Sequence, residues 1–464
     1  MNRSILKIAL PSILANITVP IVGMVDMGIA GHLDAVSATA IGGIAIGSML
    51  FDLLYWNFGF LRIGTGGLAA QAYGMEDRKE CARILLRGLG IAFLVSLVLL
   101  AVQWIFLKGA FLVVDCTPEV RELASRYFLV RIWAAPATLC LMAFKGWFIG
   151  MQDGISAMIT DLMVNGMNII LSAVFAFGLS VGGVRIVDPM GFVGIAAGTV
   201  AAQWCGLLTA TLLLMFKYYR TTVGLLDKNE VLGVFRGQQT RRFFTMNADL
   251  FVRSACMIAI YIGFTTMSAR HGDQLLAVSS ILMKILMLFS YFTDGFAYAG
   301  EALTGRYIGA GDAAMVRKTV KWTFIWSMAL AAVFMVVYQF AGVPLLQLMT
   351  DDSGVVATAE AFLPWLLLMP PVGCAAFTWD GIFIGATASR QMRNSMLWAV
   401  VSFALVWGAG MLVLSNTDLQ QTSPYQYAKT AIHILMAAYF AHLLARTVYM
   451  SVKARSVLNI TGSI

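Results

Sequence analysis

Charged residues are scarce in this chain. Asp, Glu, Lys and Arg make up 12% of its 464 residues, whereas apolar residues make up 59%. Soluble domains carry about 25% charged residues. This shortage excludes an ordinary soluble protein and is typical of a polytopic helical membrane protein.

Cysteine and histidine are also few, and neither is spaced as metal ligands or as a disulfide framework. The four histidines share no local spacing, and the six cysteines are Cys81, Cys116, Cys140, Cys205, Cys256 and Cys374. No GxxxxGK[ST] phosphate-binding motif occurs. We therefore expect no metal site and no cofactor, and we expect energy to come from an ion gradient.

A spanning helix needs about 20 mostly apolar residues. Twelve segments qualify, and the second is long enough to be kinked or broken. Their expected ranges are 6–30, 38–73, 84–107, 123–149, 155–179, 190–216, 243–268, 275–308, 318–342, 359–385, 394–414 and 428–450. Arg3 and Lys7 precede the first segment without a small-residue cleavage site, so that helix is expected to be retained.

The loop charges predict the orientation. With the N-terminus inside, the inner loops and tails hold most of the Lys and Arg, and Arg87 and Arg446 are counted among them. The outer loops hold only Lys108, Arg121, Arg126, Arg185, Arg270 and Lys429. The positive-inside rule places both termini in the cytoplasm. It also explains the net charge of +8 without a nucleic-acid partner, since no basic domain is present.

The two halves of the chain resemble each other at an offset of 235 residues. KGWFIG at 145–150 aligns with DGIFIG at 380–385, and Pro136 and Gly74 align with Pro371 and Gly309. The sequence thus predicts an all-α fold of two six-helix repeats. The expected domains are an N-terminal lobe at 1–216, a basic cytoplasmic linker at 217–242 and a C-terminal lobe at 243–464. In transporters built from such repeats, the substrate site lies near the midplane.

Asp26 is the most informative residue, because it lies in the first apolar segment, which also contains Asn16. A carboxylate inside the membrane costs roughly 3 kcal/mol on insertion scales and often handles ions or protons. A carboxylate on a helix that contains Pro20 and Gly23 makes a plausible proton-driven switch. The alternative is a structural carboxylate with a basic or hydroxyl partner.

The fifth segment carries a polar stripe of Asp161, Asn165, Asn168 and Ser172, which lie on one helical face. Such residues line a cavity or bond a neighbouring helix, and four in succession favour a cavity wall.

In the second half, Asp249 and Arg253 are spaced i, i+4 and could form a structural ion pair. Asp294 and Glu301 are interpreted as gate or structural residues. Lys284 needs a partner, and Asp294 and Asp380 are the candidates. Lys145 and Asp380 hold equivalent positions in the two halves, and the sequence does not decide whether they meet.

Two motifs, VDMGIAGHL at 25–33 and FGFLRIGTGGLAAQA at 58–72, resemble the multidrug and toxic compound extrusion family. TDGFAYAGEAL at 293–303, WDGIFIGAT at 379–387 and MRNSM at 392–396 resemble its DinF branch. The resemblance implies a V-shaped pair of six-helix lobes and antiport of organic substrates against protons or sodium. It also implies proton coupling at Asp26, with Asn168 as the branch's asparagine and Thr199 lining the N-lobe. Where many relatives have an aspartate, this chain has Ser172.

We therefore expect a monomeric, multi-pass protein of the bacterial inner membrane that exports amphipathic, cationic organic compounds in exchange for protons. The coupling residues are Asp26, Asn165, Asn168 and Ser172. The substrate cavity is expected to include Asp26, Asn16, Asp161, Thr199, Lys145, Asp380 and Lys284. Sodium coupling, with Asp26, Asn165, Asn168 and Ser172 as oxygen ligands, is one alternative. A lipid or lipid-linked-sugar flippase is another. No motif supports an enzyme.

Overall fold

A computed structural model describes residues 1–33, 37–112, 114, 116–181, 184–236, 238–350 and 352–458. Within these residues, twelve helices are long and apolar enough to cross a membrane. The predicted number of spans is confirmed, and the chain is a multi-pass membrane protein. The second span, Thr39–Gly74, is interrupted by a 3₁₀ turn at Asn57–Gly59, as its length predicted.

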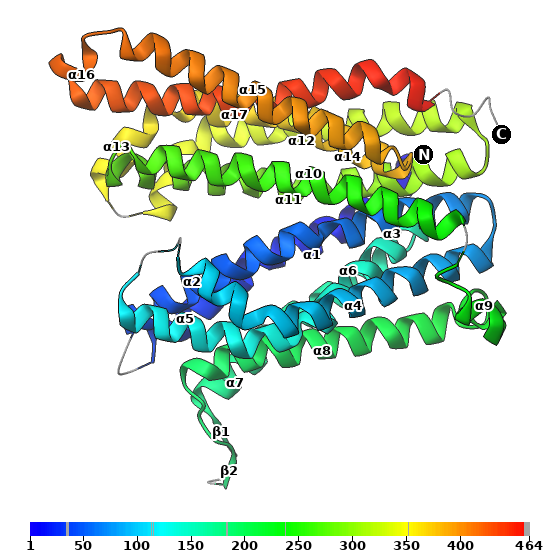
Figure 1. Cartoon of the computed structure of the whole chain (residues 1–464). Helices are drawn as coiled ribbons and strands as arrows, with labels where there is room; N and C mark the ends of the chain where they lie inside the picture. Colours follow the sequence, from blue (N-terminus) through cyan, green and yellow to red (C-terminus); the bar gives the residue numbers. More distant parts are fainter. Residues whose placement is uncertain are drawn as a thin grey trace. The chain divides into compact units, whose positions relative to one another are not determined.

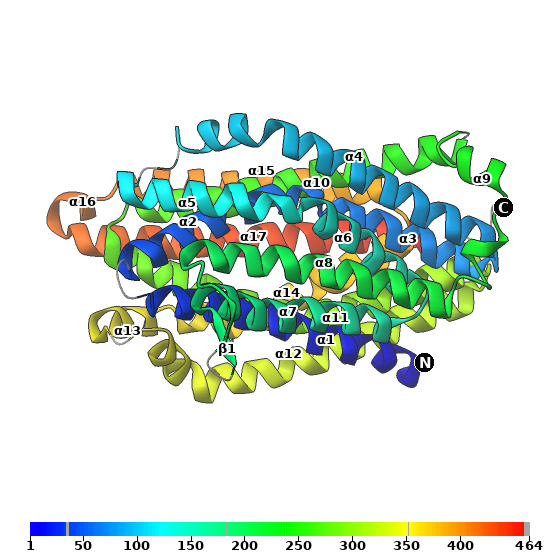
Figure 2. The same ribbon diagram turned by 90° about the horizontal axis from the view of Figure 1, so that it is seen from below.

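The first half holds six spans and a short hairpin (Figures 1 and 2). Its elements are α1 (Asn2–Gly31), α2 (Ser37–Trp56), α3 (Phe60–Gly74), α4 (Arg78–Ala110), α5 (Pro118–Arg131), α6 (Ala135–Gly150), α7 (Gly154–Phe177), β1 (Leu179–Val181), β2 (Val184–Val187), α8 (Phe192–Lys217) and α9 (Lys228–Leu232). Strands β1 and β2 pair antiparallel and project from the helices α7 and α8 (Figure 1). A 3₁₀ turn at Ile132–Ala134 joins α5 to α6 within one span.

The second half holds the other six spans. Its elements are α10 (Gln238–Ala269), α11 (Asp273–Gly309), α12 (Ala313–Met349), α13 (Ser353–Glu360), α14 (Leu363–Gly385), α15 (Ser389–Ser415), α16 (Leu419–Thr422) and α17 (Pro424–Leu458). Helix α14 packs against α11 and α12, and α15 packs along α17.

The chain divides into two compact units, Leu10–Phe244 and Met1–Ala9 with Thr245–Ile464. The basic segment 217–242 thus belongs to the first unit. The first turns of α1 group with the second unit, where the Trp326 indole donates to Asn2 (3.4 Å) and the Thr319 hydroxyl to the sulfur of Met1 (3.7 Å).

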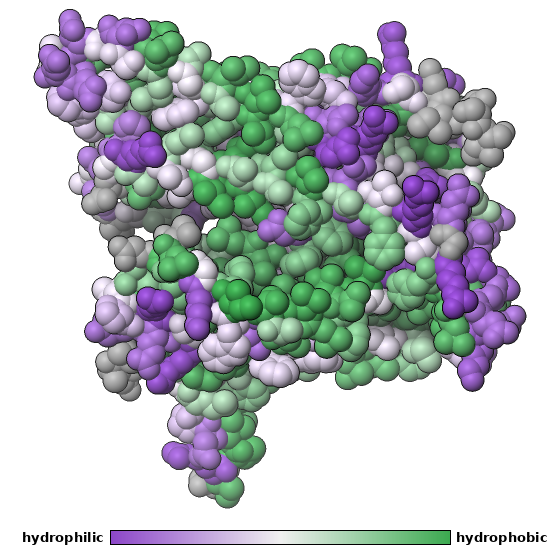
Figure 3. All heavy atoms as spheres, viewed as in Figure 1, coloured by the Kyte–Doolittle hydropathy of each residue, from purple (hydrophilic) through white to green (hydrophobic). Residues whose placement is uncertain are grey.

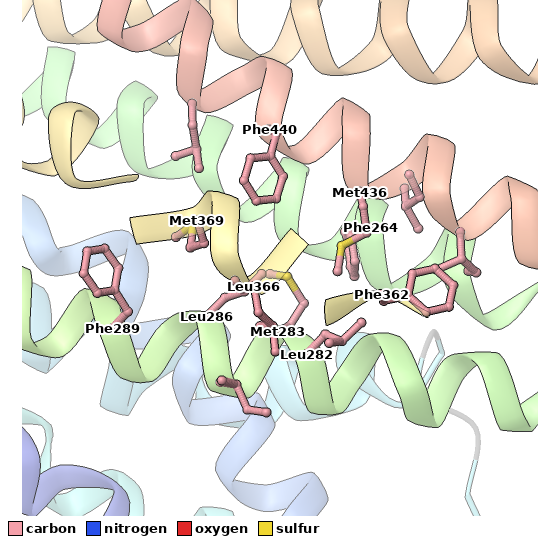
Figure 4. Packing of buried hydrophobic residues seen from close by; sticks show 14 of the residues in the cluster. Phe264, Leu282, Met283, Leu286, Phe289, Phe362, Leu366, Met369, Met436 and Phe440 are labelled. Carbon is pink, nitrogen blue, oxygen red and sulfur yellow. The ribbon is translucent and has the colours of Figure 1, made fainter. Parts of the chain in front are cut away.

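Each unit has its own apolar core. In the second unit, Phe264, Leu282, Met283 and Phe362 belong to a cluster of buried side chains to which α10 to α15 and α17 contribute. Figure 4 shows part of this cluster. In the first unit, a smaller cluster includes Phe51 and Phe128, whose stacked ring centroids are 4.8 Å apart. Many large apolar side chains remain exposed, and they gather over the middle of the helices, whereas hydrophilic residues lie toward the helix ends (Figure 3).

The predicted repeat is visible in how helices cross. A Cβ atom on Gly146 of α6 would lie 2.1 Å from the carbonyl oxygen of Arg62 in α3. A Cβ atom on Gly381 of α14 would lie 2.1 Å from the carbonyl oxygen of Ala297 in α11. Both residues of the second pair lie 235 positions after those of the first. Small residues allow such close backbone approach in membranes, so glycine fixes the same crossing twice.

The turns repeat at the same offset. Helix α3 ends at Gly74 and α11 at Gly309, and α7 and α15 begin at Gly154 and Ser389. The carboxylates of Asp77 and Asp312 accept from backbone N–H groups at the starts of α4 and α12, as N-caps do. Residues that are 235 positions apart in the sequence therefore hold equivalent structural positions in the two units.

Helix α9 of the basic segment docks on the start of α4. The Glu230 carboxylate receives Arg83 Nη2 at 2.7 Å and Lys79 Nζ at 3.2 Å. Arg87 donates from Nε to the carbonyl oxygen of Val234 (2.9 Å). Hydrogen bonding by the Asp227 amide and then by Lys79 holds the pKa of Glu230 below its usual range.

The glycine crossings predict a paired mutational effect. Gly146→Ala and Gly381→Ala should each cost about 1–3 kcal/mol of stability, because the added methyl group has no space. The apparent Tm of the purified protein in detergent measures the loss. Gly166→Ala and Gly408→Ala are matched helical controls, since a Cβ atom there has no neighbour within 4 Å. Equal losses in all four variants would contradict this role of the crossing glycines.

The docking of α9 should depend on the charge of Glu230. A carboxyl group with a lowered pKa stabilises the docked state above its ordinary pKa of about 4.3, and the contribution disappears as pH falls through the lowered value. We expect Glu230→Gln to increase hydrogen exchange in residues 228–236 at pH 7, and acidification below about pH 4 to do so in the wild type. Glu119→Gln, an exposed first-turn carboxylate of α5, is the control and should leave the segment protected.

Candidate functional site

Asp26 lies in α1, five residues before the helix ends at Gly31, or about 8 Å along the axis. Its side chain is buried, with 7% exposed. The Ser172 hydroxyl and the Arg131 guanidinium lie near its carboxyl group. Oxygen Oδ1 has no hydrogen-bond partner among the described residues. The expected intramembrane carboxylate is therefore buried and has one open acceptor.

Arg131 is a neighbour of Asp26 that sequence reasoning missed. It lies at the end of α5, where Nη1 donates to the Tyr127 hydroxyl (3.0 Å) and to Ser48 (3.4 Å). Its guanidinium carbon lies 4.8 Å from the ring centroid of Phe51. Asp52 attracts it as well. An arginine inside a spanning segment was the available signal, since such residues seek counter-charges.

The polar stripe of α7 faces α8 through a close helix contact. A Cβ atom on Gly198 would lie 2.4 Å from the backbone nitrogen of Ser172. At this crossing, Asn168 Nδ2 donates to Thr199 Oγ1 (3.0 Å), and both Ser172 Oγ and Thr199 Oγ1 donate to the carbonyl oxygen of Ile195 (3.2 Å each). Asn168, Ser172 and Thr199 are all buried.

The other two members of the stripe bond to two further helices. Asp161 pairs with Lys145 of α6 (2.8 Å), and Asn165 Nδ2 donates to Thr18 of α1 (2.5 Å). All four stripe residues thus hold neighbouring helices. These contacts agree with the alternative that the stripe bonds neighbouring helices, because each amide, hydroxyl or carboxylate finds a partner across a helix interface. The cavity wall stays a prediction.

The expected ion pair between Asp249 and Arg253 is wrong. Asp249 Oδ1 accepts from Arg393 Nη1 of α15 (2.6 Å), and Oδ2 accepts from Ser389 (3.0 Å). Arg253 donates instead to Oδ2 of Asp380 in α14 (2.7 Å). Long arginine side chains reach across helix interfaces, where burial makes a carboxylate more dependent on a counter-charge.

Asp380 has a second basic partner, Arg446 of α17, which donates to the same Oδ2 atom. Arg446 is 2% exposed, so counting it as a loop charge was wrong. Arg87 is also buried, and it pairs with Glu80 (2.6 Å). It should therefore not be counted as a loop charge either. Lys145 and Asp380 each have their ion-pair partners inside their own unit.

The remaining expected residues are placed individually. Asn16 is buried in α1, Glu301 is fully buried in α11, and Asp294 is half-buried on the same helix. Lys284 is exposed on the surface of its unit. Asp380, one of the two partners considered for Lys284, forms its ion pairs with Arg253 and Arg446.

Comparison with known proteins assigns these features to a family. The MatE family model matches residues 11–174 and 250–412. The chain is 33% identical over 404 residues to DNA damage-inducible protein F of Escherichia coli (strain K12), covering 87% of this chain and 85% of that protein. It is 23% identical over 427 residues to the probable multidrug resistance protein NorM of Photorhabdus laumondii, covering 90% and 88%.

Solved structures share the fold. A crystal structure of MATE in complex with MaL6 has a TM-score of 0.80 at 14% identity, and covers 99% of this chain and 97% of that chain. An outward-facing MATE family transporter of the MOP superfamily has a TM-score of 0.78 at 15% identity, with 99% and 96% covered.

Twelve spanning helices in two similarly built halves, with charged side chains held between helices, define a polytopic membrane transporter. The chain belongs to the MatE family of multidrug and toxic compound extrusion transporters, in the DinF branch. Family membership places it among transporters and not among enzymes.

The partners of Asp249 can be tested with double-mutant cycles. Asp249→Asn combined with Arg393→Gln should show a coupling free energy of about 0.5–3 kcal/mol. Asp249→Asn combined with Arg253→Gln should show a smaller one, because Arg253 is bonded to Asp380. Thermal unfolding of the purified variants gives both values. A larger coupling free energy of Asp249 with Arg253 than with Arg393 would contradict the observed pairing and support the ion pair at spacing i, i+4.

Proposed function

We propose that this transporter exports amphipathic, cationic organic compounds across a bacterial inner membrane in exchange for protons, with Asp26 as the protonation site. The observation that carries the proposal is the Asp26 carboxylate, which is buried in α1 and has one oxygen without a partner. Adding or removing a proton there changes the charge of the interior by one unit. Such a change is costly enough in a low dielectric to alter the preferred conformation.

Ser172 gives Asp26 a link to α7 and α8. Its hydroxyl has one proton to donate, which is directed to the Asn168 side-chain oxygen (3.4 Å) and the Ile195 carbonyl oxygen (3.2 Å). The Asp26 carboxyl group lies near the same hydroxyl. When Asp26 is charged, its carboxylate is a stronger hydrogen-bond acceptor for the Ser172 hydroxyl than the two neutral oxygens are. Once Asp26 is protonated, it no longer competes as a charged acceptor. The Ser172 hydroxyl can then donate fully to Asn168 of α7 or to Ile195 of α8.

The prolines of α1 would allow protonation of Asp26 to bend the helix. Pro11 and Pro20 lie inside the helix, and each removes a backbone hydrogen bond and permits bending. In the proposed cycle, deprotonated Asp26 favours substrate binding in an outward-closed or inward-open state. Entry of a proton from outside neutralises Asp26, bends α1 and releases the substrate.

Sodium is the alternative coupling ion, because Asp26, Asn168 and Ser172 present oxygen atoms close together. The proton is favoured because sodium requires several oxygen ligands at once. A proton can be accepted by the carboxylate without a full coordination shell.

Under this proposal, both termini and the segment 217–242 are cytoplasmic. The exposed basic side chains near α9 would then face the anionic inner leaflet, as the positive-inside rule requires. We further propose that the transporter acts as a monomer without a cofactor.

Dye efflux from proteoliposomes tests the coupling. Under an imposed proton gradient without sodium, wild type should export a cationic dye, and Asp26→Asn should lose at least tenfold in rate. Asp312→Asn is the matched control, since asparagine also caps a helix N-terminus, and it should transport normally.

Three outcomes oppose the proposal in different ways. Wild-type rate and pH dependence in Asp26→Asn would exclude Asp26 as the coupling site. Efflux only after sodium is added would assign the coupling to sodium. Absence of dye efflux with movement of labelled lipid would favour the flippase.

A further inference from the structure

The second unit contains a buried carboxylate that is shared by two arginines. Arg253 of α10 and Arg446 of α17 both donate through Nη2 to Oδ2 of Asp380 in α14. All three residues are buried. One negative charge and two positive charges leave the group with an excess of one positive charge.

The same group leaves hydrogen-bonding atoms unused. Among the described residues, Nε of Arg253, Nε of Arg446, Oδ1 of Asp380 and Nδ1 of His442 are buried without a hydrogen-bond partner. His442 precedes Arg446 by four residues on α17, so the two lie on one helix face. Buried donors are normally satisfied, and an unbalanced buried charge is strongly unfavourable.

Two other ion pairs between spanning helices, among the described residues, differ from this group. Asp249 pairs with Arg393 in the same unit, and Asp161 pairs with Lys145 in the first unit. Each has one acid for one base. The group around Asp380 thus differs from them in charge, and it has two guanidinium N–H groups to spare.

We propose that Arg253 and Arg446 form a binding site for an oxyanion, a carboxylate or phosphate group, in the second unit. Guanidinium groups bind planar carboxylates and tetrahedral phosphates through paired N–H donors. An oxyanion would balance the excess charge and accept from the two free Nε–H groups. Metal cations are excluded here by the two neighbouring positive charges. This site goes beyond the proton exchange at Asp26 and does not depend on it.

Asp380 plays a defined part in this proposal. It already occupies one N–H donor of each arginine, so it competes with the oxyanion for the same positive charges. Removing its charge should strengthen anion binding, whereas removing either arginine should weaken it. A purely structural cluster predicts no such opposite effects.

Binding to the purified full-length protein in detergent, without any gradient, tests the site. The probes are radiolabelled phosphate and radiolabelled benzoate in chloride-free buffer, each displaced by its own unlabelled anion. We expect saturable binding of at least one probe, with one site per chain. Arg253→Gln and Arg446→Gln should weaken it about ten- to hundredfold. Asp380→Asn should strengthen it.

Arg393→Gln is the matched control, because it removes an arginine of the same unit from a balanced pair, and it should bind as wild type does. If an Arg→Gln variant fails to fold, Arg253→Lys and Arg446→Lys keep the charge and should retain weakened binding. Anion-dependent thermal stabilisation should also be larger for Asp380→Asn than for wild type.

Binding of phosphate alone would identify the oxyanion as an inorganic counter-ion, and binding of benzoate alone would identify it as the acidic group of an organic compound. Absence of saturable binding of both probes to wild type would overturn the proposal. Equal loss in Arg393→Gln, or lost binding in Asp380→Asn, would also overturn it. None of these results depends on proton-driven efflux.

Discussion

The cost of burying polar groups away from water governs this structure. In a membrane, backbone groups are satisfied within helices, and each buried charge needs a partner on a neighbouring helix. Lys145 with Asp161, and Asp249 with Arg393, meet this requirement as balanced pairs. Glycines at the crossings let the backbones approach, so polar side chains can reach one another. Around Asp26 and Asp380, the numbers of acidic and basic groups are unequal. Buried polar atoms there lack a hydrogen-bond partner among the described residues.

The two halves share a backbone plan but differ in their interiors. The positions equivalent to Asp161, Asn168 and Ser172 are Met396, Phe403 and Trp407. These three side chains join or pack against the apolar core of the second unit. The first unit therefore has polar contacts between α7 and α8, whereas the second has an apolar core at the equivalent positions and forms its interhelical ion pairs among α10, α14, α15 and α17.

This division gives the halves different chemistry on one fold. The first unit presents an acid with a nearby arginine, which suits the binding and release of a proton. The second presents an excess of positive charge around one carboxylate, which suits an anion. Since the shared crossings set the backbone and the side chains set the chemistry, either half can change its ligand without changing its helix packing.

The sequence by itself determined the number of spans, the break in the second span, the repeat offset and the burial of Asp26. These follow from hydropathy, from glycine and proline positions and from the cost of an intramembrane charge, all of which are local properties. Tertiary structure decided which charges meet. Arg253 lies four residues from Asp249 yet bonds Asp380, Arg446 is a core residue and not a loop charge, and Arg131 lies beside Asp26. Local spacing identifies neighbours on one helix, whereas the partner of a long side chain depends on how separate helices cross.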